Sequence, residues 1–126
     1  MSDSLIQINQ LLQNYFELLY HGNVDLIPIC FYDDGRVVNL DGEEMISIDM
    51  AGFYARISNR KPPAAIKEDR NDIICMIDQF SPTTALAKVE VTINGDRFYD
   101  YLTLIRRAGS WKIISKVFHR SCHQSY

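Results

Sequence analysis

The stretch TALAKVEVTINGDRFYDYLTLIRRAGSWKIISKVFH, at residues 84–119, decides the fold of this chain. It holds three runs rich in β-branched and aromatic residues, which are typical of strands. Two turn signals separate the runs, Asn94-Gly95 and Ala108-Gly109, and the first is the stronger two-residue hairpin signal. Another strand is expected near residues 69–78. The C-terminal half therefore predicts an antiparallel meander.

The N-terminal half has helical periodicity instead. Ser4 followed by Gln7 is a capping box, which predicts a helix of about 16 residues that ends near Gly22. Apolar residues recur every three or four positions along it and form one broad face. They are Ile8, Leu11, Leu12, Tyr15, Phe16, Leu18 and Leu19. Short helices are also expected after Asn23 and after Ser47. Helices followed by strands predict an α+β fold, with the helices packed on one face of the sheet.

The size and charge of the chain restrict its class. We expect one domain over residues 1–126, with residues 116–126 forming the end of the last strand and a flexible tail. A net charge of -3 argues against nucleic acid or an anionic membrane as a partner. No apolar run reaches the roughly 20 residues of a membrane-spanning helix, and residues 1–20 lack a secretory signal. Three widely spaced cysteines favour free thiols and a cytoplasmic location.

The two hairpins also predict which side chains face the helices. If both turns contain two residues, Asp100 lies opposite Val89 and Val117, and Phe98 lies opposite His119. One face of the sheet is then nearly all apolar and should be the concave face. Asp100 and His119 are its polar exceptions. A bulge in either hairpin would turn the strand to its other face.

These two polar residues are the candidate catalytic pair. A carboxylate among apolar side chains costs several kcal/mol unless it is paired or protonated. An acid and an imidazole in an apolar cavity are typical of a small-molecule pocket. In the alternative interpretation, Asp100 and His119 only satisfy each other or bond a helix tyrosine. The candidate ligand-binding residues around the pair are Tyr15, Tyr54, Trp111 and, at the rim for an anionic group, Arg60.

The opposite face of the sheet alternates aromatic and charged residues. Tyrosines beside paired charges are typical of a wet protein–protein contact. We therefore expect a twofold homodimer through this outer face, although a solvated face is the alternative. The residues expected in the contact are Tyr99, Tyr101, Lys116 and Phe118.

Several segments resemble one known superfamily over residues 5–120. They are Tyr15-Phe16, Leu19-Tyr20-His21-Gly22, Asp100-Tyr101-Leu102-Thr103-Leu104, Gly109-Ser110-Trp111-Lys112-Ile113 and Lys116-Val117-Phe118-His119. The chain is similar in them to nuclear transport factor 2-like proteins, which have a cystatin-like cone fold, and most to the putative lumazine-binding branch. The resemblance implies a strongly curved sheet wrapped around three helices, often in a dimer. Relatives include ketosteroid isomerases, scytalone dehydratases, polyketide cyclases and limonene epoxide hydrolases, while others only bind ligands or proteins.

Three functions remain open from the sequence. In the first, Asp100 is the general acid or base of a cofactor-independent isomerase, dehydratase or cyclase, with His119 orienting it and Tyr15 or Tyr54 stabilising an oxyanion. In the second, the cavity binds a small apolar molecule without turnover. In the third, the outer face makes the chain an interaction module. We expect no cofactor and no metal, because there is no phosphate-binding glycine loop and Cys122-His123 with His119 lacks a fourth zinc ligand.

Overall fold

A computed structural model describes residues 3–122 of the chain. Its helical segments are α1 (Asp3–His21), η1 (Val24–Leu26), α2 (Ile27–Cys30), α3 (Met50–Asn59) and η2 (Pro63–Ile66). Its strands are β1 (Phe31–Asp41), β2 (Glu44–Ile48), β3 (Asp72–Ser81), β4 (Thr84–Ile93), β5 (Asp96–Arg107) and β6 (Ser110–Ser121). The last strand therefore continues to Ser121, and residues 123–126 of the predicted tail lie outside the described part.

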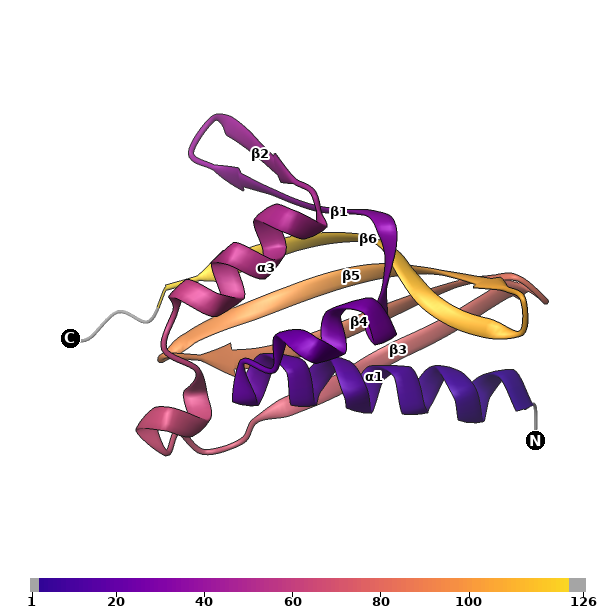
Figure 1. Cartoon of the computed structure of the whole chain (residues 1–126), viewed down its shortest axis with the longest axis horizontal. Helices are drawn as coiled ribbons and strands as arrows, with labels where there is room; N and C mark the ends of the chain where they lie inside the picture. Colours follow the sequence, from indigo (N-terminus) through magenta and orange to yellow (C-terminus); the bar gives the residue numbers. More distant parts are fainter. Residues whose placement is uncertain (1–2, 123–126) are drawn as a thin grey trace.

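The six strands form one curved sheet in the order β2-β1-β6-β5-β4-β3. The long helix α1 and the shorter α3 lie on the same side of this sheet, and the β1–β2 hairpin extends beyond it (Figure 1). The predicted α+β fold is confirmed. The sheet differs from the predicted one in one pairing, because β1 runs parallel to β6 while every other neighbouring pair is antiparallel.

Both predicted hairpin turns contain two residues. Asn94 and Gly95 have φ angles of 53° and 83°, and Ala108 and Gly109 have 51° and 80°. Two consecutive positive φ angles are what a type I′ turn requires, and its twist matches that of the flanking strands. The β4–β5 register follows from the first turn, and Asp100 lies opposite Val89 as predicted.

A β-bulge in β6 changes the predicted register of its second half. Leu104 pairs with Ile113, but Thr103 pairs with Ser115, so Ile114 is an extra residue in β6. An extra residue turns every later side chain of the strand to the opposite face. Asp100 consequently lies opposite Phe118, and Phe98 lies opposite Arg120. The predicted pairings of Asp100 with Val117 and of Phe98 with His119 are therefore wrong.

The bulge exchanges the inward and outward residues at the end of β6. Lys116 faces the helices and is buried, and Phe118 also packs against the core. Val117 and His119 instead lie on the outer face. The predictions that Lys116 and Phe118 belong to the outer face, and that His119 belongs to the inner face, are corrected by this one insertion.

The core lies between the helices and the inner face of the sheet. The apolar face of α1 is buried as its periodicity predicts, from Ile8 to Leu19. It packs with Phe53 and Ile57 of α3 and with inward residues of β4, β5 and β6, such as Leu102. No helix within residues 3–122 is both long and apolar enough to cross a membrane.

Two alanine substitutions on β6 test the bulge. Ile113 is fully buried, so Ile113→Ala should lower the free energy of unfolding by about 2–5 kcal/mol. Val117 is 48% exposed, so Val117→Ala should change it by less than about 1 kcal/mol. Urea denaturation of the two variants and the parent measures the difference. Equal losses at the two positions would favour the register without a bulge.

Candidate functional site

A cavity of about 600 Å³ opens between α3 and the inner face of the sheet. This volume lies within the range of small-molecule sites. Its walls combine phenyl rings with cationic side chains. The lining residues are Asn39, Asp41, Ile46, Phe53, Arg56, Arg60, Val91, Ile93, Phe98, Lys116, Phe118, Arg120 and Cys122.

Lys116 is the buried cation of this cavity. Its residue is 5% exposed, and its Nζ lies 5.1–5.3 Å from the ring centres of Tyr15, Phe53 and Phe118. The bulge at Ile114 places it here. The pKa of Lys116 is lowered to about 8, chiefly by burial and also by the positive charges of Arg60 and Arg56, while the charge of Asp100 opposes the change.

Asp100 lies next to the amine. Its residue is 1% exposed, and its Oδ2 is 3.8 Å from the Nζ of Lys116. The hydroxyl of Tyr15, on α1, donates a hydrogen bond of 2.6 Å to the same oxygen. Burial and the neighbouring Asp100 together raise the pKa of Tyr15 well above its usual value, so this phenol stays a donor. Lys116 lines the cavity and Asp100 does not, so a ligand meets the amine first.

Arg60, at the C-terminal end of α3, lines the same cavity as Lys116. Its Nη2 is buried and has no hydrogen-bond partner among the described residues. Burial also lowers the pKa of its guanidinium, although Tyr15 and Asp100 favour the charged form. Arg56 lies one helical turn earlier, and it lines the same cavity. Three cationic groups, Lys116, Arg60 and Arg56, therefore share one part of the cavity.

The segment after Arg60 is tied to the sheet and to α1. The carboxylate of Glu68 accepts hydrogen bonds from the backbone N–H groups of Asn94 and Gly95, at 2.8 and 2.7 Å. Tyr20 donates to the backbone oxygen of Glu68, and the Asn94 side chain donates to that of Lys61. These contacts restrain the chain that leads from α3 to β3 and so help to hold Arg60 in place.

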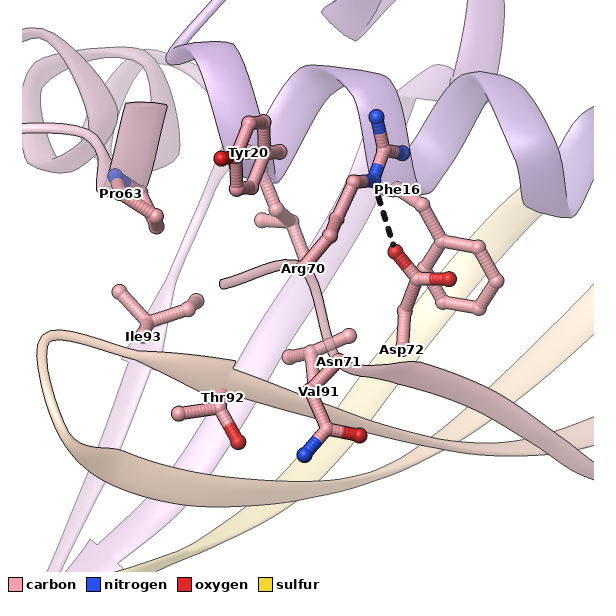
Figure 2. Close-up of a pocket in the computed structure, with 10 residues that line it drawn as sticks. Phe16, Tyr20, Pro63, Arg70, Asn71, Asp72, Val91, Thr92 and Ile93 are labelled. Atoms are coloured by element: carbon pink, nitrogen blue, oxygen red, sulfur yellow. Dashed lines mark hydrogen bonds and ion pairs between the residues drawn. The ribbon is translucent and has the colours of Figure 1, made fainter. Parts of the chain in front are cut away.

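A second, much smaller crevice lies between α1, η2 and the start of β3 (Figure 2). Arg70 crosses it, bonded to Asp72 at 3.1 Å and to Glu17 at 2.8 Å, and its guanidinium lies over the Tyr20 ring. The crevice has a volume of about 10 Å³, which is room for no more than one water molecule. The crevice is therefore part of the restraint on this segment.

The comparisons with known proteins agree with this architecture. Residues 3–119 match the protein family described as "Putative lumazine-binding". The chain belongs to this family. A curated relative, "Aldolase FrzH" from Cladobotryum sp, is 40% identical over 107 residues, which are 83% of this chain and 82% of that protein.

Solved structures similar to this member of the putative lumazine-binding family show the same fold. A nuclear transport factor 2-like protein of unknown function from Shewanella baltica superposes with a TM-score of 0.85 at 23% identity, covering 97% of this chain and 95% of that one. A ketosteroid isomerase-like protein from Erwinia carotovora atroseptica gives 0.73 at 13% identity, covering 95% and 98%. The predicted resemblance to the superfamily and to this branch is confirmed.

The structure brings together only some of the residues predicted for the site. Asp100, Tyr15 and Arg60 surround Lys116. His119 is exposed on the outer face, where its ring stacks on Tyr99 with centroids 6.2 Å apart. The prediction of an Asp100–His119 pair is therefore wrong, and its cause is the bulge.

The two other predicted ligand-binding residues lie outside the cavity. Tyr54 is 52% exposed on α3 and lines a separate shallow groove with Ile27 and Met50. Among the described residues, the tyrosine that donates to Asp100 is Tyr15. Trp111 is buried as predicted, but it borders another groove, beside Leu11 and Pro28. Neither residue contributes to the cavity that contains Lys116.

Sequence reasoning missed Lys116 and Phe118 as cavity residues. One signal was available, because Ile113-Ile114 places two apolar residues side by side and is followed by the polar pair Ser115-Lys116. Strict alternation is broken at that point, which is how a bulge appears in a sequence.

The lowered pKa of Lys116 can be measured directly. We expect its amine to titrate near pH 8, protonated below that value and neutral above it. Carbon-13 NMR of labelled lysines follows this titration, and the signal is assigned by its absence from Lys116→Met. An unfolded lysine keeps its proton up to about 10.5, so a rise in pH between the two values favours the folded chain. A midpoint near 10.5 in the folded protein would contradict the buried amine.

Proposed function

We propose that the cavity activates a carbonyl compound through the amine of Lys116, in a cofactor-independent aldol-type reaction. The observation that carries this proposal is a buried amine of lowered pKa that lines a cavity of about 600 Å³. Reactive lysines of this kind are made by desolvation and by neighbouring cations. Both causes act on Lys116.

The lowered pKa has a quantitative consequence for reactivity. Only the neutral amine attacks a carbonyl carbon. With a pKa of about 8, roughly one Lys116 in ten is neutral at pH 7. An ordinary lysine, with a pKa near 10.4, is neutral in fewer than about one in a thousand molecules. The site therefore supplies much more of the reactive form than an ordinary lysine does.

The chemical steps balance with the groups present. The Lys116 nitrogen adds to the substrate carbonyl, and the adduct takes up one proton from the solvent and loses water, which leaves a cationic Schiff base. This cation withdraws electrons, so a proton on the neighbouring carbon passes to water and a neutral enamine forms. The enamine carbon then bonds to a second carbonyl carbon, whose oxygen takes up a proton from water and becomes a hydroxyl group. Water finally hydrolyses the renewed cationic Schiff base, which frees the amine and returns the proton to the solvent. The reverse order cleaves the same carbon–carbon bond.

Asp100 takes a different role from the one predicted from the sequence. It lies behind the amine, 3.8 Å away, with Tyr15 fixing its orientation. We propose that it positions Lys116 and stabilises the cationic Schiff base by its negative charge. Tyr15 acts through Asp100 and is a positioning residue.

The comparisons support carbonyl chemistry and also a second candidate function. A relative 40% identical to this chain is named an aldolase, which favours the reaction above. The family is described by ligand binding, which favours a cavity that holds a small molecule without turnover. The two functions differ in whether Lys116 forms a covalent bond.

Reductive trapping distinguishes these two functions. The full chain is incubated with 4-phenylbutan-2-one and sodium cyanoborohydride, and mass spectrometry with peptide mapping locates the adduct. We expect a single reduced adduct on Lys116, because its amine is neutral more often than an ordinary lysine. Lys116→Met should give none, while Lys88→Met, on the outer face, should react like the parent. If the ketone binds but no adduct forms at Lys116, the cavity binds without covalent catalysis.

We also propose that the outer face of the sheet forms a homodimer. The bulge changes the predicted contact, because Val117 and His119 replace Lys116 and Phe118 beside Tyr99 and Tyr101. Both tyrosines and Val117 are exposed large side chains, which supports a contact with a second copy.

A charge in this face tests the dimer. Tyr101→Glu places two carboxylates near the twofold axis, so it should shift the protein to a monomer in analytical ultracentrifugation. Tyr54→Glu, on exposed α3, should leave the dimer intact. A parent protein that sediments as a monomer at micromolar concentration would rule the interface out.

A further inference from the structure

We propose that the carbonyl compound carries a carboxylate, which Arg60 and Arg56 bind while Lys116 meets the carbonyl. This inference deepens the proposed function and rests on it for the carbonyl part. It assigns the substrate class as oxo-carboxylates with an apolar body.

The unpartnered guanidinium of Arg60 is the first observation. A guanidinium has five N–H donors, accepts no hydrogen bond and keeps its charge in proteins. The Nη2 of Arg60 is buried without a hydrogen-bond partner among residues 3–122. A buried charged donor without a partner costs more free energy than a neutral one. An acceptor brought by a ligand would remove this cost.

Three other arginines have carboxylate partners, and the remaining three, Arg36, Arg106 and Arg107, are exposed to solvent. Arg70 bonds Glu17 and Asp72, Arg97 bonds Glu90, and Arg120, at the mouth of the cavity, bonds Asp96. A neighbouring carboxylate therefore balances the charge of each of these three guanidinium groups.

Arg56 and Arg60 have no such partner in the described part of the chain. They are four residues apart on and just after α3, where like charges repel each other. The carboxylate that does line the cavity, Asp41, is exposed and acts on Arg120. One wall of the cavity therefore holds two cations that form no ion pair within residues 3–122, since the nearby Asp100 pairs with Lys116.

These cations are close to the reactive amine. The charges of Arg60 and Arg56 both lower the pKa of Lys116, and Arg60 also acts on Tyr15 and Asp100. A single ligand can therefore place its anion on the arginines and its carbonyl at the amine. The planar fork of a guanidinium binds a carboxylate through two parallel hydrogen bonds.

The aromatic side chains that line the rest of the cavity can pack against the apolar part of a ligand. Phe98 and Phe118 lie with ring centroids 5.7 Å apart, and Phe53 is also in the lining. Aromatic side chains supply much of the binding energy for apolar ligand groups. The cavity thus offers a cationic end, a reactive amine and an aromatic surface.

The test uses two probes that cannot form a Schiff base. 4-Phenylbutanoate and 4-phenylbutanamide have the same shape and differ in charge. By NMR titration of the full chain, the carboxylate should bind at least about tenfold more tightly than the amide. Arg60→Met should remove most of this preference, and Arg60→Lys should reduce it less, because lysine keeps the charge but lacks the fork. Arg106→Met, on the exposed end of β5, is the matched control and should keep it.

The inference is overturned if the parent binds both probes equally, or if the preference survives in Arg60→Met and Arg60→Lys alike. Tighter binding of phenyl phosphate than of 4-phenylbutanoate would also overturn it, in favour of a phosphate ligand. Because neither phenylbutanoyl probe has a reactive carbonyl, this result is independent of reductive trapping with 4-phenylbutan-2-one. Failure of the carboxylate preference and failure of the Schiff base are therefore separate outcomes.

Discussion

The contact between the Lys116 amine and Asp100 is the constraint on which the cavity depends. Two charged groups lie inside an apolar core, 3.8 Å apart, with the Tyr15 hydroxyl on the carboxylate. The removal of charges from water costs several kcal/mol per ion, and a pair of opposite charges recovers only part of it. Leucine or methionine at both positions would avoid that cost. The pair is therefore better explained by chemistry than by stability.

The position of the pair depends on one extra residue. Without the bulge at Ile114, Val117 would face Asp100 and Lys116 would lie in solvent. The insertion also brings Phe118 to the inner face, where its ring and that of Phe53 flank the amine. A single irregularity of β6 thus supplies both the reactive group and the apolar surroundings that lower its pKa. Bulges are over-represented near active sites because they redirect side chains in this way.

Much of the fold follows from local sequence signals, while the site depends on a long-range feature. The capping box, the helical period of α1 and the two hairpin turns are each readable from a few neighbouring residues. They give the α+β order, the β4–β5 register and the inward position of Asp100. The bulge has no turn residue to mark it, only the broken alternation at Ile113-Ile114. The bulge lies in a strand that pairs with β5 and β1, which are distant in sequence, so the local pattern predicts the wrong face for both His119 and Lys116.

The parallel pairing of β1 with β6 explains why α3 can reach this site. β1 lies beside the strand that carries Lys116, and α3 follows the β1–β2 hairpin directly, so its end returns over the inner face. The segment after α3 is then held by Glu68 on the β4–β5 turn. Arg60 therefore lies between α3 and a restrained loop, which limits the freedom of its side chain to turn into solvent. A restrained, buried guanidinium has already lost conformational entropy, so an anion that binds it meets a preorganised partner.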